Sequence, residues 1–319
     1  MERLRQDDPP QIGPFTTLAR LDPEAAERSV PERRYLARSA DGERTVLVGV
    51  PRVGADPSRW AVEAEGARRL RLPRFLDVAE VGGTAGFPWY AAPYTPVLPL
   101  PAVLAAHGGP LPEDVVRGLG AALAEGLTAA HAQGVAHAGL SPAAVLVTPG
   151  GPVLSCFGAV RAAAPDGVHR AGLPGLDPGC LAPEQASGGA PGPLGDVFAL
   201  GSVLAYASTG HTVPEQSELP PGLRGLVGAC LARDPADRPR SAGELLRGLA
   251  APSRVPDPRL PPSPGPATAL DGAAHPVVLP GRVVAAFAAQ SAWLLAAELP
   301  AVQQPFTSPA SPASPQKAY

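Results

Sequence analysis

One stretch of the sequence is apolar on every side of the helix that it predicts. Residues 196–209 (DVFALGSVLAYAST) contain a single charged side chain and are followed by Gly210, a residue that commonly ends helices. A helix that is apolar all round has to be buried inside a protein. The fold must therefore surround this helix, and the segments before it and after it have to supply the surrounding elements.

The pattern of the segments before this helix changes near residue 111. Short runs typical of strands come first, at 45–50 (TVLVGV) and 87–91 (FPWYA), and one helix candidate lies between them at 59–71. From Leu111 apolar residues recur at helical spacing behind Glu113 and Asp114, which suit a first helical turn, and Gly134 ends this pattern. A hairpin is predicted at 145–147 and 153–155. This order predicts an α+β fold with a small β-rich lobe followed by a larger helical lobe.

The folded part is expected to end near residue 250. Ser241 and Glu244 form a capping box that opens a last short helix, and the composition then changes to Pro, Ser and Ala. The predicted organisation is an N-terminal arm (1–10), a domain (11–250, with lobes of about 11–95 and 96–250), a Pro-rich linker (251–280), an amphipathic helix (281–299, with its helical pattern over 283–298) and a disordered Ser/Pro tail (300–319).

Charge and composition exclude several classes of function. The net charge of −3 provides no basic surface for a phosphate backbone, so nucleic acid is not an expected partner. The three cysteines lack the spacing of metal ligands and are read as reduced thiols of a cytoplasmic protein. No secretory signal is visible, and the apolar run at 283–297 is too short to span a membrane. Lys317 is the only lysine among 26 basic residues, and the chain has no asparagine.

Five ordered segments resemble motifs of bacterial Ser/Thr protein kinases. They are similar to the catalytic loop (HAQGVAHAGLSPAAVLV, 131–147), the D-F-G segment (SCFGAVR, 155–161), the end of the activation segment (LAPEQAS, 181–187), the start of the central helix (GDVFALG, 195–201) and the late Arg motif (CLARDPADRP, 230–239). The resemblance covers about residues 11–250 and implies the bilobal protein-kinase-like fold.

The same resemblance shows that the positions used for phosphotransfer have changed. Kinases position ATP, hold Mg²⁺ and orient a hydroxyl with dedicated residues. The matching positions are the strand lysine (Gly49), the catalytic aspartate (Gly139), the lysine that follows it (Ser141), and the two metal ligands (Ala144 and Cys156). The segment that matches the Gly-rich loop, 21–35, contains no glycine. No catalytic or metal-binding residue is therefore predicted.

Residues whose family role is structural persist. The resemblance implies that His137 packs the catalytic loop, that Phe157 joins the two lobes and that Asp196 accepts backbone N–H groups. It also implies that Glu184 pairs with Arg238. Glu63 matches the glutamate that normally pairs with the strand lysine, and without that lysine it is expected to be a solvated helix residue.

These positions lead to a prediction of a pseudokinase, a kinase-like module that binds proteins as a scaffold or regulator without phosphotransfer. The partner and the oligomeric state stay open, and no cofactor is expected. The hinge around Pro93 and Thr95 retains one backbone carbonyl and one N–H that can read adenine, which leaves residual ATP binding without metal. The alternative is an enzyme, a divergent ATP-binding Ser/Thr kinase or other transferase with unconventional metal and phosphate ligands.

Overall fold

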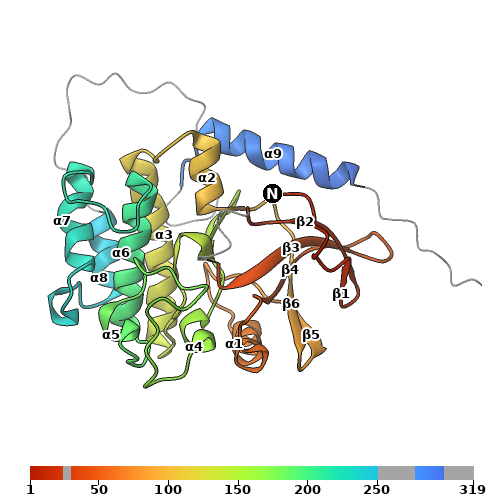
Figure 1. Ribbon diagram of the computed structural model, residues 1–319. Coiled ribbons are helices and arrows are strands. Elements are labelled where there is room, and N and C mark those ends of the chain that lie inside the picture. Colours follow the sequence, from red (N-terminus) through yellow and green to blue (C-terminus); the bar gives the residue numbers. More distant parts are fainter. Residues whose placement is uncertain (24–29, 251–276, 298–319) are drawn as a thin grey trace, which may run out of the picture.

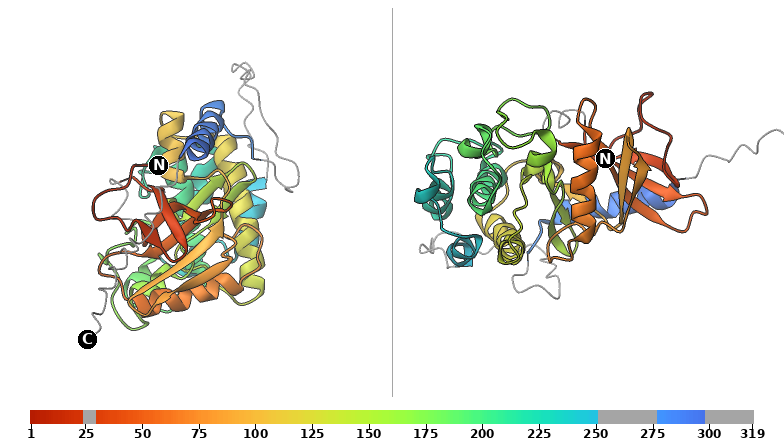
Figure 2. Two further views of the ribbon diagram at one scale, coloured as in Figure 1. Left: turned by 90° about the vertical axis from the view of Figure 1, so that its right-hand side faces the viewer. Right: turned by 90° about the horizontal axis from the view of Figure 1, so that it is seen from below.

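The computed structural model describes residues 1–23, 30–250 and 277–297 (Figure 1). A curled β-sheet with one helix forms the first lobe, and a larger helical lobe follows (Figures 1 and 2). This is the bilobal protein-kinase-like fold that the sequence predicts. The predicted linker and tail lie outside the described residues, apart from 277–280.

The sheet of the first lobe is antiparallel, in the order β1-β2-β3-β4-β6-β5. Its strands are β1 (Gln11–Ile12), β2 (Phe15–Arg20), β3 (Glu32–Ser39), β4 (Thr45–Pro51), β5 (Glu80–Thr84) and β6 (Phe87–Pro93). Side chains alternate between its two faces. Tyr35 and Val48 are buried on one face in a cluster with Phe15, whereas Leu36 and Leu47 on the other face pack with Leu146 of the second lobe.

Helix α1 (Pro57–Arg69) begins and ends two residues earlier than predicted. The carboxylate of Asp56 accepts hydrogen bonds from the backbone N–H groups of Ser58 and Arg59, and Pro57 occupies the first helical position. The N-terminal arm packs on the same lobe, where the Tyr35 hydroxyl donates to Asp8 over 2.7 Å.

Helix α6 (Pro193–Thr209) is the buried central helix of the second lobe, and Gly210 ends it in a left-handed conformation with φ of 86°. It begins three residues earlier than predicted. The helices that pack around it are α3 (Glu113–Ala132), α7 (Pro221–Cys230) and α8 (Ala242–Ala250), and shorter helices are α2 (Leu100–His107), α4 (Ala159–Ala163) and α5 (Pro183–Ala186).

A three-stranded sheet lies between the lobes and carries the loops of the candidate site. It consists of β7 (Leu98–Pro99), β8 (Val145–Thr148) and β9 (Gly151–Leu154), in that order. The predicted hairpin is therefore present, but β9 ends before Ser155.

Helix α9 (Gly281–Ala296) lies against α2 and extends over the sheet of the first lobe (Figure 1). The amphipathic helix is thus present within the predicted range, although residues 298–299 lie outside the described part. None of the helices in the described ranges is long and apolar enough to cross a bilayer.

Candidate active site

The five changed positions lie on segments that meet between the lobes. Gly49 is on β4, and Gly139, Ser141 and Ala144 belong to the loop between α3 and β8. Cys156 follows β9. A Cβ atom built on Gly139 would lie 2.2 Å from the carbonyl oxygen of Cys156, so these two backbone segments touch.

Arg34 is a cation that the sequence analysis did not single out, and it lies at the centre of this site. In the pairing of β3 with β4, Arg34 is the cross-strand partner of Gly49, so the two positions share a face of the sheet. Its fully buried guanidinium donates to the hydroxyl of Ser155 over 2.9 Å and to the carbonyl of Ala143 over 2.9 Å. A positive charge therefore reaches both the catalytic-loop segment and the D-F-G-like segment.

Asp22 neutralises this cation. Its carboxylate accepts two hydrogen bonds from Arg34, one of them 2.8 Å long from Nε, in a bidentate pair. Burial disfavours the guanidinium charge, but the attraction of the Asp22 carboxylate outweighs it and raises the pKa of Arg34. The buried guanidinium therefore keeps its positive charge.

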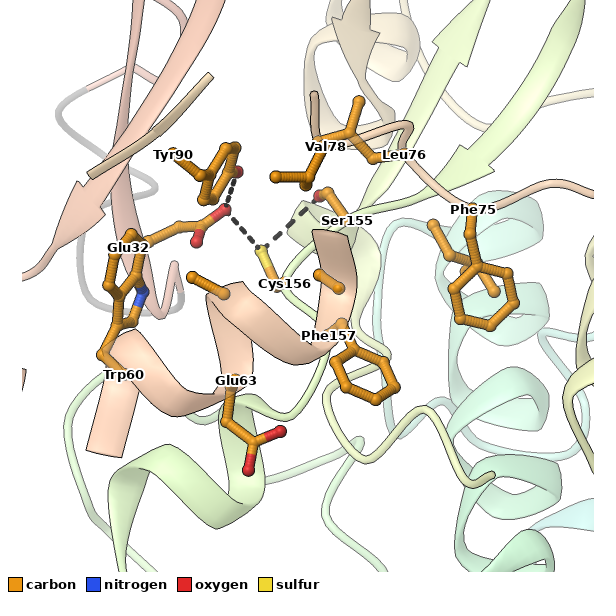
Figure 3. Close-up of a pocket in the computed structure, with 13 residues that line it drawn as sticks. Glu32, Trp60, Glu63, Phe75, Leu76, Val78, Tyr90, Ser155, Cys156 and Phe157 are labelled. Atoms are coloured by element: carbon orange, nitrogen blue, oxygen red, sulfur yellow. Dashed lines mark hydrogen bonds between the residues drawn. The ribbon is translucent and has the colours of Figure 1, made fainter. Parts of the chain in front are cut away.

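Cys156 belongs to a hydrogen-bonded group with Glu32 and Tyr90 (Figure 3). The Tyr90 hydroxyl donates to Oε1 of Glu32 over 2.6 Å, and the Cys156 thiol donates to the same oxygen over 3.4 Å. Burial raises the pKa of all three groups. The thiol is therefore protonated and acts as a hydrogen-bond donor.

At two of the changed positions, Gly49 and Gly139, neighbouring atoms leave no room for a side chain. A Cβ on Gly49 would lie 2.3 Å from the Tyr90 ring, which stacks on Trp60 with ring centres 5.7 Å apart. A Cβ on Gly139 would meet backbone at 2.2 Å, which cannot move aside as a flexible side chain can. The packing around both positions requires glycine.

The residues do not fit the Mg²⁺ ion that the fold family implies. Magnesium prefers oxygen ligands, but Ala144 has no side-chain donor and Cys156 presents a protonated thiol. Across the described ranges, no group of three or more His, Cys, Asp or Glu side chains could hold a metal ion.

Glu63 on α1 is not the solvated residue that the sequence analysis expected. Its carboxylate accepts two hydrogen bonds from Arg161 on α4, over 2.9 and 2.7 Å, and its side chain is only 15% exposed. Arg161 also lies over the Phe157 ring, 4.9 Å from its centre. A local arginine thus replaces the missing lysine as its partner and ties α1 to the segment after Phe157.

The predicted structural residues around the catalytic loop are in contact. His137 lies between Phe75 and Phe157, with ring-centre distances of 5.5 and 6.1 Å. The Asp196 carboxylate accepts the backbone N–H of His137 over 2.7 Å and that of Ala138 over 2.9 Å. Ala138 has φ of 53°, an uncommon conformation for a residue other than glycine, and these bonds hold it there.

Glu184 and Arg238 form the ion pair expected beneath the activation segment. Two hydrogen bonds of 2.7 and 2.9 Å join the carboxylate to the guanidinium, and the Arg238 side chain is fully buried. Burial tends to raise the pKa of Glu184, but the hydrogen bonds from Arg238 outweigh it and lower this pKa. The pair fixes the end of the segment against the second lobe.

Asp177 is a second functional candidate that sequence reasoning missed. It lines a cavity of about 20 Å³ together with Gly139 and Ser141. Its Oδ1 accepts the backbone N–H of Gly179 over 2.8 Å, which orients the carboxylate. A carboxylate therefore lines the same cavity as the position that lost its aspartate, but it comes from another segment. The sequence signal was an acidic residue five positions before Ala182-Pro183-Glu184.

Pro93 and Thr95, the expected adenine-reading residues, connect the lobes at the end of β6, and both are exposed. Beyond them, the buried backbone of Val97 is hydrogen-bonded to Gln290 of α9. The hinge is thus in contact with a helix nearly 200 residues away in the chain, a contact that the sequence did not predict.

Comparisons with known proteins identify relatives of the chain. No family model matches it. The chain is 34% identical over 271 residues to a probable serine/threonine-protein kinase, PkwA, of Thermomonospora curvata (78% of this chain, 36% of that protein). It is 33% identical over 265 residues to the serine/threonine-protein kinase AfsK of Streptomyces coelicolor (76% and 32%). The chain spans about a third of the length of these relatives.

Solved structures show the same fold. The PknI kinase domain of Mycobacterium tuberculosis matches with a TM-score of 0.56 and 23% identity, covering 74% of this chain and 94% of that one. A Rad53 fragment in complex with AMP-PNP matches with a TM-score of 0.56 and 17% identity, covering 74% and 64%. At this identity the likeness concerns the fold alone.

These relatives correct the predicted function. The vacated family positions predict a scaffold without phosphotransfer, but the matching proteins are named serine/threonine-protein kinases at 33–34% identity over about three quarters of the chain. That prediction is wrong by this comparison, and the findings favour its alternative, a divergent kinase. The prediction considers only the residues at the family's own catalytic positions. Arg34 and Asp177 lie outside those positions.

Proposed function

Because the chain belongs to the bacterial Ser/Thr protein-kinase-like family, we propose that it is a divergent Ser/Thr protein kinase domain with relocated phosphate and proton ligands. ATP is the phosphoryl donor, and a protein serine or threonine is the acceptor. The buried free cysteines support a reducing compartment, the cytoplasm, as its location.

One observation carries the proposal, the position of Arg34. It stands opposite Gly49, and its guanidinium lies within hydrogen-bond distance of the catalytic-loop backbone and of Ser155. Arginine can bind phosphate in a bidentate manner and keeps its charge when buried. Arg34 can therefore take the role of the strand lysine from the neighbouring strand.

Space and further positive charge lie beside this cation. A cavity of about 130 Å³ is lined by Arg33, Arg34 and Arg52, and an adjoining cavity of about 400 Å³ is lined by Arg52 and Arg59. Carboxylates line them too: Glu32 lines both, Asp7 and Asp22 line the smaller, and Asp56 lines the larger. Guanidinium groups at this entrance can neutralise a triphosphate chain that no conventional metal site holds.

Asp177 is the proposed general base. In the transfer, the acceptor oxygen bonds to the γ-phosphorus, the bond from that phosphorus to the β–γ bridging oxygen breaks, and ADP leaves with the electron pair. The hydroxyl proton passes to the Asp177 carboxylate. The cavity that it shares with Gly139 supports this role, because Gly139 stands where the family places its own base.

Opposite effects of two substitutions on the same ion pair test the phosphate site. Asp22 competes with phosphate for Arg34, so Asp22→Asn should tighten binding of a fluorescent ATP analogue about tenfold, whereas Arg34→Met should weaken it at least tenfold. Arg44→Met, at an exposed pair with Glu80, is the matched control and should bind like the wild type. Weaker binding in both pair variants would indicate general damage and would refute the phosphate role.

Transfer of radiolabelled γ-phosphate to a degenerate Ser/Thr peptide library tests the base. Asp177→Asn should lower the rate about 100-fold without changing nucleotide affinity. Asp237→Asn, an exposed aspartate of the second lobe, is the control and should keep the rate. Equal rates for both variants would remove Asp177 from the reaction.

A further inference from the structure

Helix α9 lies where the two lobes meet on the hinge side. It contacts α2 and extends across to the first lobe, as the blue helix of Figures 1 and 2 shows. Three apolar side chains of the helix, Val283, Phe287 and Leu294, are buried in contact with the rest of the protein. Leu295, next along the helix, is 86% exposed, so one face of α9 is committed to this contact.

Gln290 binds the hinge backbone through its amide group. Its Oε1 accepts the N–H of Val97 over 2.8 Å, and its Nε2 donates to the carbonyl of the same residue over 2.8 Å. The Tyr94 hydroxyl also donates to Oε1, over 3.0 Å. This pairing of one acceptor and one donor with a backbone N–H and carbonyl is the chemistry by which an adenine edge is read. It occurs two residues beyond Thr95.

Leu294 fills the apolar space next to that backbone. It is 3% exposed and packs in one cluster with side chains from the sheet of the first lobe, the hinge and β8, namely Leu21, Leu36, Leu47, Val97 and Leu146. Both walls of the interlobe gap are therefore in contact with the helix. A flat, apolar ring could enter this space only if Leu294 left it.

Arg38 fixes the end of the helix to the same lobe. Its guanidinium donates to the carbonyl of Leu294, in the last turn of α9, and to that of Ala297, the residue directly after the helix. A cation at a helix C-terminus is also favoured by the helix dipole. The helix is thus held by its side chains and by its terminal carbonyls.

We propose that α9 is an occluding helix that competes with the adenine ring of ATP for the hinge side of the cleft. The inference rests on the proposed function, because it assumes that the cleft takes a nucleotide. In the described conformation Gln290 holds the hinge backbone and Leu294 fills the apolar space. ATP and the docked helix then exclude each other, and nucleotide affinity is lowered by the fraction of molecules in which the helix is docked.

Two measurements on the full chain test this competition. The first is titration with a fluorescent ATP analogue of the wild type, of Gln290→Ala/Leu294→Ala and of the control Leu295→Ala. The second is hydrogen exchange at the Val97 amide, which reports helix release independently of nucleotide. We expect the double variant to exchange faster at Val97 and to bind the analogue at least tenfold more tightly than the wild type. Leu295→Ala should match the wild type in both.

The outcomes distinguish occlusion by α9 from the proposed kinase function. Faster exchange at Val97 with unchanged, measurable nucleotide binding would overturn the occlusion and leave the proposed kinase function standing. Faster exchange with no binding in any variant would overturn both, because the cleft would then take no nucleotide. Unchanged exchange at Val97 in the double variant would overturn the assignment of these two side chains as the contacts that hold the helix.

Discussion

Acidification should destabilise the protein through His137. This side chain is fully buried, and burial lowers its pKa to about 4, against 6.5 for an exposed histidine. The unfolded chain therefore binds the proton more tightly than the folded one. The contribution of neutral His137 to the free energy of unfolding is complete above pH 6.5 and is lost as the pH falls towards 4.

The size of this loss follows from the difference between the two pKa values. The full difference corresponds to about 3.4 kcal/mol, and the part that develops between pH 7 and pH 5 is about 1.8 kcal/mol. Such a change is a substantial part of the stability of a typical domain, which is about 5–15 kcal/mol.

Urea unfolding of the wild type and of His137→Phe at pH 7, 6 and 5 measures the free energy of unfolding that is lost when His137 is protonated. Phenylalanine fits a site between two other aromatic rings and carries no proton, so the variant should lose about 1.8 kcal/mol less than the wild type over this range. His211→Phe, at an exposed histidine, is the control and should follow the wild type. Equal losses for the wild type and His137→Phe would refute the assignment of a buried, neutral imidazole.

Two further substitutions and one labelling experiment have expected outcomes. Gly49→Lys should lower the melting temperature in a thermal scan and should not raise phosphotransfer, because its Cβ would meet the Tyr90 ring; higher activity would contradict the closed position. Asp196→Ala should cost about 3 kcal/mol in urea unfolding, since two buried N–H groups lose their acceptor, and a loss below about 1 kcal/mol would contradict this. Cys156 should react with a thiol reagent only as fast as the protein unfolds, because burial raises its pKa; rapid labelling of the native protein would show otherwise.

The architecture was predictable because local patterns determine it. The apolar run at 196–209 requires burial on all sides, and it became the central helix α6. Boundaries were less accurate where capping decides them, as at Asp56, which starts α1 two residues early. The packing of α9 on the hinge was not predictable, because it depends on a contact between Gln290 and Val97 across most of the chain.

The candidate site was only partly predictable for a related reason. The vacated positions could be read from motif spacing, but their replacements come from other segments. Arg34 becomes relevant only through its register opposite Gly49, and Asp177 only through the cavity that it shares with Gly139. The missing strand lysine predicts a solvated Glu63, whereas its actual partner, Arg161, comes from another element. Strand register and the contact of one loop with another depend on the tertiary structure, which a linear motif does not encode.

A divergent kinase with an occluding helix should transfer phosphate once α9 has been released from the hinge. The decisive measurement is the transfer of radiolabelled γ-phosphate from ATP to Ser/Thr peptides by Gln290→Ala/Leu294→Ala, with and without Arg34→Met added. The account predicts ATP-dependent labelling that falls at least 100-fold when Arg34 is replaced. Absence of labelling from the released protein while it binds ATP, or labelling that Arg34→Met leaves unchanged, would contradict it.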